Sequence, residues 1–191
     1  MAVALEISDA KRYGANGENV GRLLERLMNI DWYQNVGKNN SSIVEKTEKF
    51  MNTLGIETYQ VEVIKKEEVT TMAPVLSLEE SHLWQELKEI PEQIKQKIEE
   101  SERNEILEDI VYNVPELVYH GAFKGAYDIF EKEKTVAFLV GYAMYVSVLA
   151  CAWEIVSDLK GWEDNPFLYI VEILEDGHLP LGPQSNTFFI S

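Results

Sequence analysis

One uninterrupted apolar run constrains the fold of this chain more than any other feature. Val136–Trp153 has the sequence VAFLVGYAMYVSVLACAW, eighteen positions without a charged side chain. A helix of this length reaches the lower limit for spanning a bilayer. The same run also fits the central helix of a soluble fold, or two short strands that turn at Gly141. The pattern within the run and its flanks decide between these interpretations.

The run divides at helical spacing into a bulky side and a thin side. The bulky side consists of Phe138, Tyr142, Tyr145, Leu149 and Trp153, and the thin side of Ala143, Ser147, Ala150 and Cys151. A helix packed among other helices needs this division, because small residues let a neighbour approach while large ones fill gaps. Neither flank carries the cluster of Lys or Arg that orients a membrane span. We therefore predict that residues 136–156 form the buried central helix of a soluble fold.

The charge balance is strongly acidic. Thirty-three acidic residues against 17 basic ones leave a net charge of −16 and a pI near 4.6. Residues 77–109 hold 11 acids and 4 bases, and residues 150–191 hold 7 acids and one base. Such a surface repels nucleic-acid phosphates and anionic lipids and attracts basic proteins. We therefore predict a basic protein partner, no nucleic acid and no membrane, although solubility alone also explains an acidic surface.

Cysteine content and the first residues bear on the compartment. Cys151 is the single cysteine of the sequence, so no intrachain disulfide forms. The opening MAVALEISDAKR lacks the basic start and the apolar stretch of a secretory signal. Both observations predict a cytoplasmic protein.

Local patterns predict several helices and few strands. Helices are expected near residues 20–27, 42–54, 77–90, 91–114, 115–129 and 165–177, and strands near the N-terminus, at 59–64 and at 187–190. Gly55 and Gly177 are expected to end their helices. The helix at 42–54 has an apolar stripe at helical spacing, which consists of Ile43, Thr47, Phe50, Met51 and Leu54. Residues 65–74 show no periodicity and are expected to form a connection. The predicted fold is mainly α, a single-domain helical bundle around a central apolar helix (136–156), with a minor β element of two or three short strands. One domain covers 1–191, or a small N-terminal α/β part (1–72) packs on a helical part (77–178).

Residues with catalytic potential are few and do not form a known motif. Two Glu-x-x-His strings end at His82 and His178, but Gly177 interrupts the second, so a paired metal site is not predicted. His120 lacks a carboxylate at a convincing distance in sequence, and Cys151 sits among small apolar residues. No phosphate-binding glycine loop or zinc spacing occurs. We predict that the protein is not an enzyme and takes no cofactor or metal.

The acidic segments and their neighbouring aromatic residues are the predicted partner-binding surface. Acidic groups steer a basic protein, and Trp anchors it. The predicted residues are Glu99, Glu100, Glu102, Glu105, Glu108, Asp109, Glu154, Asp158, Trp162, Glu163 and Asp164. The hypothesis is an acidic binding protein, most concretely of the immunity or inhibitor type, that neutralises a basic partner such as a toxin domain. Two alternatives stay open: a helical small-molecule binder or enzyme with a pocket beside helix 136–153, and a structural or assembly subunit, with homo-oligomers included.

Overall fold

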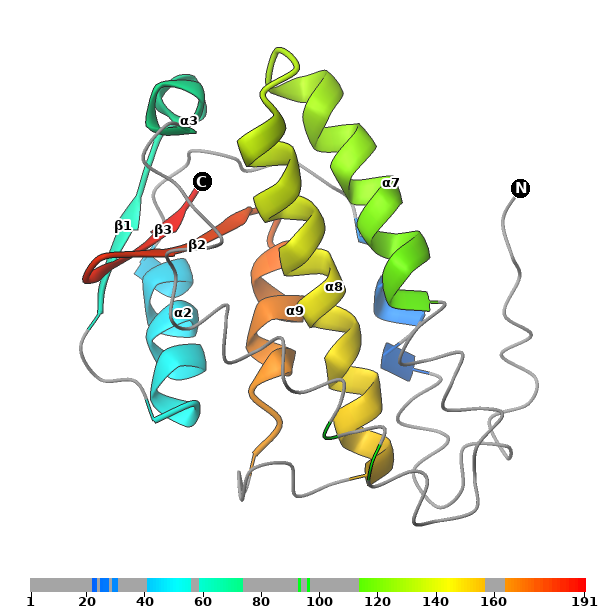
Figure 1. The fold of residues 1–191 in the computed structure, drawn as a ribbon. Helices are drawn as coiled ribbons and strands as arrows, with labels where there is room; N and C mark the ends of the chain where they lie inside the picture. The colour runs from blue at the N-terminus through cyan, green and yellow to red at the C-terminus, as the bar shows by residue number, and fades with distance from the viewer. Residues whose placement is uncertain are drawn as a thin grey trace.

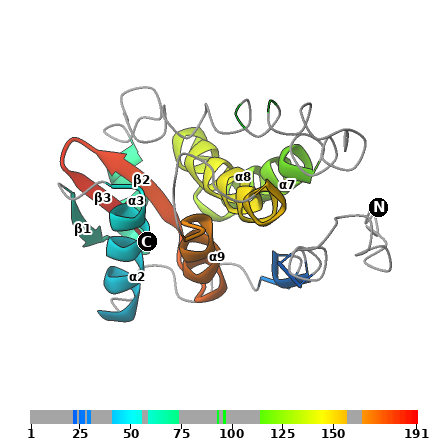
Figure 2. The ribbon, with the colours of Figure 1, turned by 90° about the horizontal axis from the view of Figure 1, so that it is seen from below.

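The central apolar run forms one helix, α8 (Lys134–Val156), in the computed structural model of the chain. The structure describes residues 22–23, 25–27, 29–30, 41–55, 59–73, 93, 96, 114–156 and 164–191. α7 (Val114–Ile129) runs antiparallel beside α8, and α9 (Phe167–Glu175) packs against it (Figure 1). Viewed from below, α9 lies between α8 and α2 (Ser41–Thr53) (Figure 2). The predicted mainly α fold with a minor β element is confirmed.

The interior of the fold surrounds most of α8. An eighteen-residue window of this helix is long and apolar enough to cross a membrane, and 72% of that window is buried inside the protein. The core helix of a soluble protein has the same character. The alternative of two strands turning at Gly141 was wrong, because Gly141 lies inside the continuous helix.

The two sides of α8 differ in burial. The thin side, Ala143, Ser147, Ala150 and Cys151, is fully buried. On the bulky side Leu149 is also buried, but Phe138 is 46% exposed and Tyr142 and Tyr145 are half-buried. From the sequence, the bulky side is expected to fill gaps inside the bundle. Leu149, Tyr142 and Trp153 do pack in or against the core, whereas Phe138 lies toward the surface, so the bulky side is less buried than the thin side.

Helix α7 approaches α8 closely at a glycine, Gly141. A Cβ atom on Gly141 would lie 2.9 Å from Cε2 of Tyr119 and 3.2 Å from its backbone oxygen. Both distances are shorter than ordinary van der Waals contact. Gly141 therefore sets how near the two helices lie.

Helix α2 follows the predicted apolar stripe. Ile43, Thr47, Phe50 and Met51 are buried at helical spacing, and Gly55 ends the segment with a φ of +76°. The left-handed conformation suits glycine, which has no Cβ to clash. Phe50 meets Phe188 of the sheet edge-on, with ring centroids 6.1 Å apart.

A short helix occupies the stretch that was predicted to be a connection. α3 (Lys66–Met72) begins where the Glu68 carboxylate accepts a hydrogen bond from the Lys65 backbone N–H, at 3.0 Å. Val69 is its buried residue. A helix of seven residues with one buried position shows no detectable hydrophobic period in the sequence. Its formation depends on this capping interaction and on burial of Val69.

Three strands form the minor sheet, in the order β1–β3–β2. β1 (Gln60–Val63) runs parallel to β3 (Thr187–Ile190), and β2 (Pro180–Gln184) runs antiparallel to β3. β1 and β3 confirm the two strands predicted at residues 59–64 and 187–190. The strand expected from the N-terminus lies outside the described residues.

Prolines are tolerated in β2 because of its register. Pro180 pairs with Ile190 and Pro183 with Phe188. The Ile190 backbone is directed toward β1, since its carbonyl accepts a hydrogen bond from the Ile64 N–H. The nitrogens of Pro180 and Pro183 therefore point away from β3, so their lack of an N–H removes no hydrogen bond between β2 and β3.

α9 lies within the helix predicted near residues 165–177 and is two residues shorter at each end. The Asn165 side chain accepts a hydrogen bond from the Phe167 N–H at 3.2 Å, and Gly177 has a φ of +79°. Helices predicted at 77–90 and 91–114 lie outside the described residues, except that Gln93 and Gln96 are helical. The division into one or two domains stays a prediction.

Candidate functional site

A charged cleft lies between the helical residues near position 26 and the carboxyl end of α9. Its volume is about 550 Å³, and its described lining residues are Arg22, Glu25, Arg26, Asn29, Ile30 and Glu175. Apolar spacing explains its position, because Leu23, Leu27 and Ile30 are buried in the core. The polar residues between them are thereby directed toward α9 and solvent.

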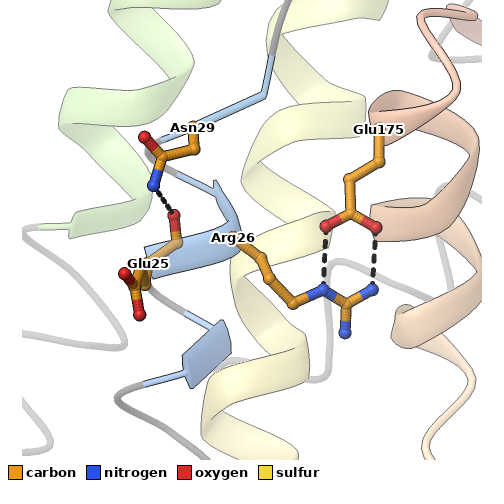
Figure 3. A network of polar contacts seen from close by, with 4 residues as sticks. All are labelled: Glu25, Arg26, Asn29 and Glu175. Atoms are coloured by element: carbon orange, nitrogen blue, oxygen red, sulfur yellow. Dashed lines mark hydrogen bonds and ion pairs between the residues drawn. The ribbon is translucent and has the colours of Figure 1, made fainter.

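Arg26 and Glu175 form a bidentate ion pair in the cleft (Figure 3). The guanidinium donates from Nε to Oε1 and from Nη2 to Oε2, both at 2.8 Å. These hydrogen bonds raise the pKa of the Arg26 side chain, so it stays charged. Both side chains are about one-third exposed, at 38% and 31%, so solvent weakens the ion pair. Asn29 beside them donates from Nδ2 to the Glu25 carbonyl oxygen at 2.8 Å (Figure 3).

Two cations compensate the acidic end of α9. Glu175 is its last residue and binds Arg26, while the next residue, Asp176, binds Lys46 of α2. Carboxylates at a helix C-terminus are unfavourable, because the unpaired carbonyls there already carry partial negative charge. The paired cations remove this penalty and connect α9 to α2 and to the helical residues around Arg26. Two acidic residues of the 150–191 segment, Glu175 and Asp176, are thus paired with cations of the same chain.

The predicted partner-binding residue Glu154 takes part in the junction between α8 and α9. Asn165 is 5% exposed and donates from Nδ2 both to the Ala150 carbonyl oxygen, at 3.0 Å, and to Glu154 Oε1, at 3.1 Å. Through Oδ1 the same side chain accepts a hydrogen bond from the N–H of Phe167, the first residue of α9. Glu154 itself is half-buried. Its first role visible in the structure is therefore to hold the start of α9 against the end of α8.

Most of the other predicted partner-binding residues fall outside the described part of the chain. Among them only Asp164 and Glu154 are described, and Asp164 is exposed. The residues outside the described ranges are Glu99, Glu100, Glu102, Glu105, Glu108, Asp109, Asp158, Trp162 and Glu163.

The side chains with catalytic potential lie in different environments, some buried and some exposed. Cys151 is buried, and burial raises the pKa of its thiol to about 12, so the thiol is protonated and unreactive near neutral pH. His120 is exposed beside Glu116, with Nε2 and Oε1 3.7 Å apart. His178 is buried in the turn after α9, and His82 lies outside the described residues. The described residues include no group of three potential metal ligands.

A row of aromatic rings on α7 and α8 was missed as a feature of the surface. Tyr119, Phe123 and Tyr127 stack along α7, with centroids 6.2 and 6.0 Å apart. Phe138 of α8 meets Phe123 edge-on at 5.0 Å. The spacing of four residues along α7 was visible in the sequence. Which side of the helix pair these rings occupy depended on the packing of α8.

Comparisons of this chain with protein families, with curated proteins and with solved structures found no match.

Proposed function

We propose that this protein is an acidic, cytoplasmic, non-enzymatic binding protein of the immunity or inhibitor type, which neutralises a basic partner such as a toxin domain. The net charge of −16 carries the proposal. Support comes from exposed carboxylates that form no ion pair within the described part of the chain. They are Glu48, Glu62, Glu67, Asp128, Glu131 and Asp164.

The excess charge acts mainly on the rate of association. Acidic groups that are not neutralised internally create a negative potential that extends about 10 Å at moderate ionic strength and draws a basic protein inward. Glu175 and Asp176 contribute little to this potential, because Arg26 and Lys46 neutralise them. The steering charge is therefore assigned mainly to the 77–109 segment, and the exposed carboxylates named above add to the general negative potential.

The test begins with capture of a partner from the native host on the immobilised full-length protein, followed by its identification. Association rates are then measured by stopped-flow between low and high NaCl concentrations. Electrostatic steering predicts a rate that falls by about tenfold or more as salt increases from about 0.02 to about 0.5 M. A captured partner whose association rate is independent of salt contradicts the proposal.

Two variants with equal changes in net charge locate the steering surface. Glu99→Gln with Glu100→Gln removes two charges from the predicted surface, and Glu67→Gln with Glu131→Gln removes two exposed charges elsewhere. The first pair is expected to reduce the association rate at low salt more than the second, because steering is strongest near the contact. Equal effects would assign the attraction to net charge alone and contradict the predicted surface.

A small-molecule binder or enzyme is the second candidate, and the cleft beside Arg26 is the observation that favours it. Such a pocket was predicted beside helix 136–153, but the thin side of α8 is fully buried. The described cleft lies instead between residues 22–30 and Glu175, and Arg26 and Glu175 provide opposite charges for a polar ligand. Ligand screening by thermal shift tests this candidate, and loss of any hit in Arg26→Gln would locate the ligand.

A structural or assembly subunit is the third candidate. Phe138 is the large apolar side chain that is exposed in the described residues, and it lies beside the aromatic row of α7. Aromatic surfaces of this kind are enriched at protein interfaces. Analytical ultracentrifugation tests the candidate, because an assembly subunit forms a stable oligomer at micromolar concentration.

A further inference from the structure

The outer edge of β1 presents backbone hydrogen-bonding groups in regular order. In a strand, successive N–H and C=O groups point to opposite sides. The Gln60 N–H donates to the Asn186 carbonyl at 2.9 Å, and the Ile64 N–H donates to the Ile190 carbonyl at 2.8 Å, so the even-numbered residues are directed toward β3. The N–H and C=O groups of Val61 and Val63 are consequently directed away from β3.

No described residue covers these outward groups. β1 is the terminal strand of the sheet order, and it lies at the periphery of the molecule in both ribbon views (Figures 1 and 2). Within the described part of the chain, the outward N–H and C=O groups of Val61 and Val63 form no backbone hydrogen bond to another element. β3 in contrast is bonded on both sides, to β1 and to β2. An edge of this kind is a template for a further strand.

Side chains on the two faces of β1 define the chemistry of a matching strand. Val61 and Val63 are half-buried against the core, whereas Gln60 and Glu62 are exposed on the opposite face. Glu62 is the one charged side chain of the strand and has no ion-pair partner in the described part of the chain. A neighbouring strand therefore places apolar side chains beside the valines and a cation beside Glu62, where opposite charges attract.

We propose that the outer edge of β1 binds an extended segment of a basic partner as a fourth strand, in which apolar residues alternate with Lys or Arg. The basic character of the segment rests on the proposed function. The addition of a strand at this edge rests on the backbone geometry of β1 alone. The added strand hydrogen-bonds to the N–H and C=O groups of Val61 and Val63. This interaction gives the acidic protein a docking site in addition to long-range steering.

Charge disfavours a second copy of this chain as the occupant. Antiparallel pairing of two β1 strands through Val61 and Val63 places Glu62 of one copy opposite Glu62 of the other, and like charges at that position destabilise a pair. Each copy also carries a net charge of −16. The lysines that follow the strand, Lys65 and Lys66, are offset by Glu67 and Glu68 and do not change the sign.

The experiment uses the full-length protein and two capped peptides, KVKVKV and EVEVEV, with amide hydrogen exchange followed by NMR. When nine-tenths of the protein is bound to KVKVKV, the amides of Val61 and Val63 should exchange about tenfold more slowly, because only the free fraction exchanges. The amides of Gln60 and Glu62 already bond to β3 and should change little. EVEVEV should give no protection at the same concentration.

A matched pair of variants tests the same contact by affinity. Val61→Pro removes the outward N–H and leaves the bonds to β3, while Val61→Thr keeps that N–H and the branched shape. Val61→Pro should bind KVKVKV about fivefold more weakly than Val61→Thr, which corresponds to about 1 kcal/mol for one net hydrogen bond. If Val61→Pro does not fold, the exchange experiment on the unsubstituted protein still decides the question.

Several results would overturn the proposal. They are an absence of KVKVKV binding, binding that leaves Val61 and Val63 unprotected, equal affinity of the two variants, and equal protection by EVEVEV. Self-association that Val61→Pro abolishes would assign the edge to a second copy instead. Failure of the proposed function is recognised separately, by a captured partner whose association rate does not depend on salt.

Discussion

Substitution of Gly141 by alanine tests whether the contact between α7 and α8 is as close as the structure shows. The added methyl group would lie 2.9 Å from Cε2 of Tyr119 and 3.2 Å from its backbone oxygen. The Tyr119 ring can rotate away, but its backbone oxygen moves only with α7. Gly121 is the matched control, because it lies inside α7 and a Cβ there meets nothing within 4 Å.

The expected magnitudes follow from two opposing contributions. Replacing a glycine by alanine inside an exposed helix stabilises it by about 1 kcal/mol, and this contribution is common to both variants. The extra methyl group at a closely packed position costs about 1–3 kcal/mol. Gly121→Ala should therefore raise the free energy of unfolding by about 1 kcal/mol. Gly141→Ala should lower it by up to about 2 kcal/mol, the difference between these two contributions.

Urea unfolding followed by circular dichroism measures both free energies. A chain of 191 residues shifts its melting temperature by about 2–4 °C per kcal/mol, so thermal unfolding gives an independent value. The slope of the urea dependence should be the same for both variants and the unsubstituted protein, which confirms that the surface exposed on unfolding is unchanged.

Equal stabilisation by the two substitutions would refute the reasoning. It would mean that α7 lies farther from α8 than the distances to Tyr119 indicate. A loss larger than about 3 kcal/mol in Gly141→Ala would also contradict it, since overpacking by one methyl group rarely costs more.

Three further predictions concern buried and paired polar groups. Because burial raises the pKa of Cys151 from its usual value to about 12, the folded protein keeps a proton that the unfolded chain loses above about pH 9. Between about pH 9 and 12 the free energy of unfolding should therefore fall more steeply in the unsubstituted protein than in Cys151→Ala. The difference in slope is at most about 1.4 kcal/mol per pH unit. Parallel urea titrations that show the same slope for both proteins would contradict this. Asn165→Ala should lower the free energy of unfolding by about 2 kcal/mol, because Asn165 makes three hydrogen bonds. Asn165→Asp places a carboxylate beside Glu154 and should therefore destabilise the protein more at pH 7 than at pH 4. Chemical denaturation at both pH values checks this. A double-mutant cycle of Arg26→Gln and Glu175→Gln should give a coupling of about 1 kcal/mol that decreases in 1 M NaCl, and a coupling of zero would show that the bidentate contact contributes no stability.

Local periodicity predicted the elements that carry their own pattern. The apolar run became α8, the stripe of Ile43, Phe50 and Met51 became the buried face of α2, and Gly55 and Gly177 adopt the left-handed conformations expected of helix ends. Such features depend on neighbours within four residues along the chain, so they are visible without knowledge of the fold.

Elements whose stability depends on distant partners were missed. α3 has one buried residue, Val69, and is too short to show a period. β2 contains Pro180 and Pro183, which argue against a strand until the register shows that their nitrogens face away from β3. The roles of acidic residues also changed, because Glu175 is identified as an internal contact only when Arg26, 149 positions away, lies beside it.

The sequence by itself determined which segments are apolar enough to be buried, where most helices end, and that the molecule is strongly acidic. Tertiary structure alone decided which side of α8 lies near the surface, which carboxylates are neutralised, and that β1 is left at the edge of the sheet. The physical reason is range. Helical periodicity and backbone conformation are set by residues close in sequence, whereas burial of a face, pairing of a charge and exposure of a strand edge depend on contacts between residues far apart in sequence.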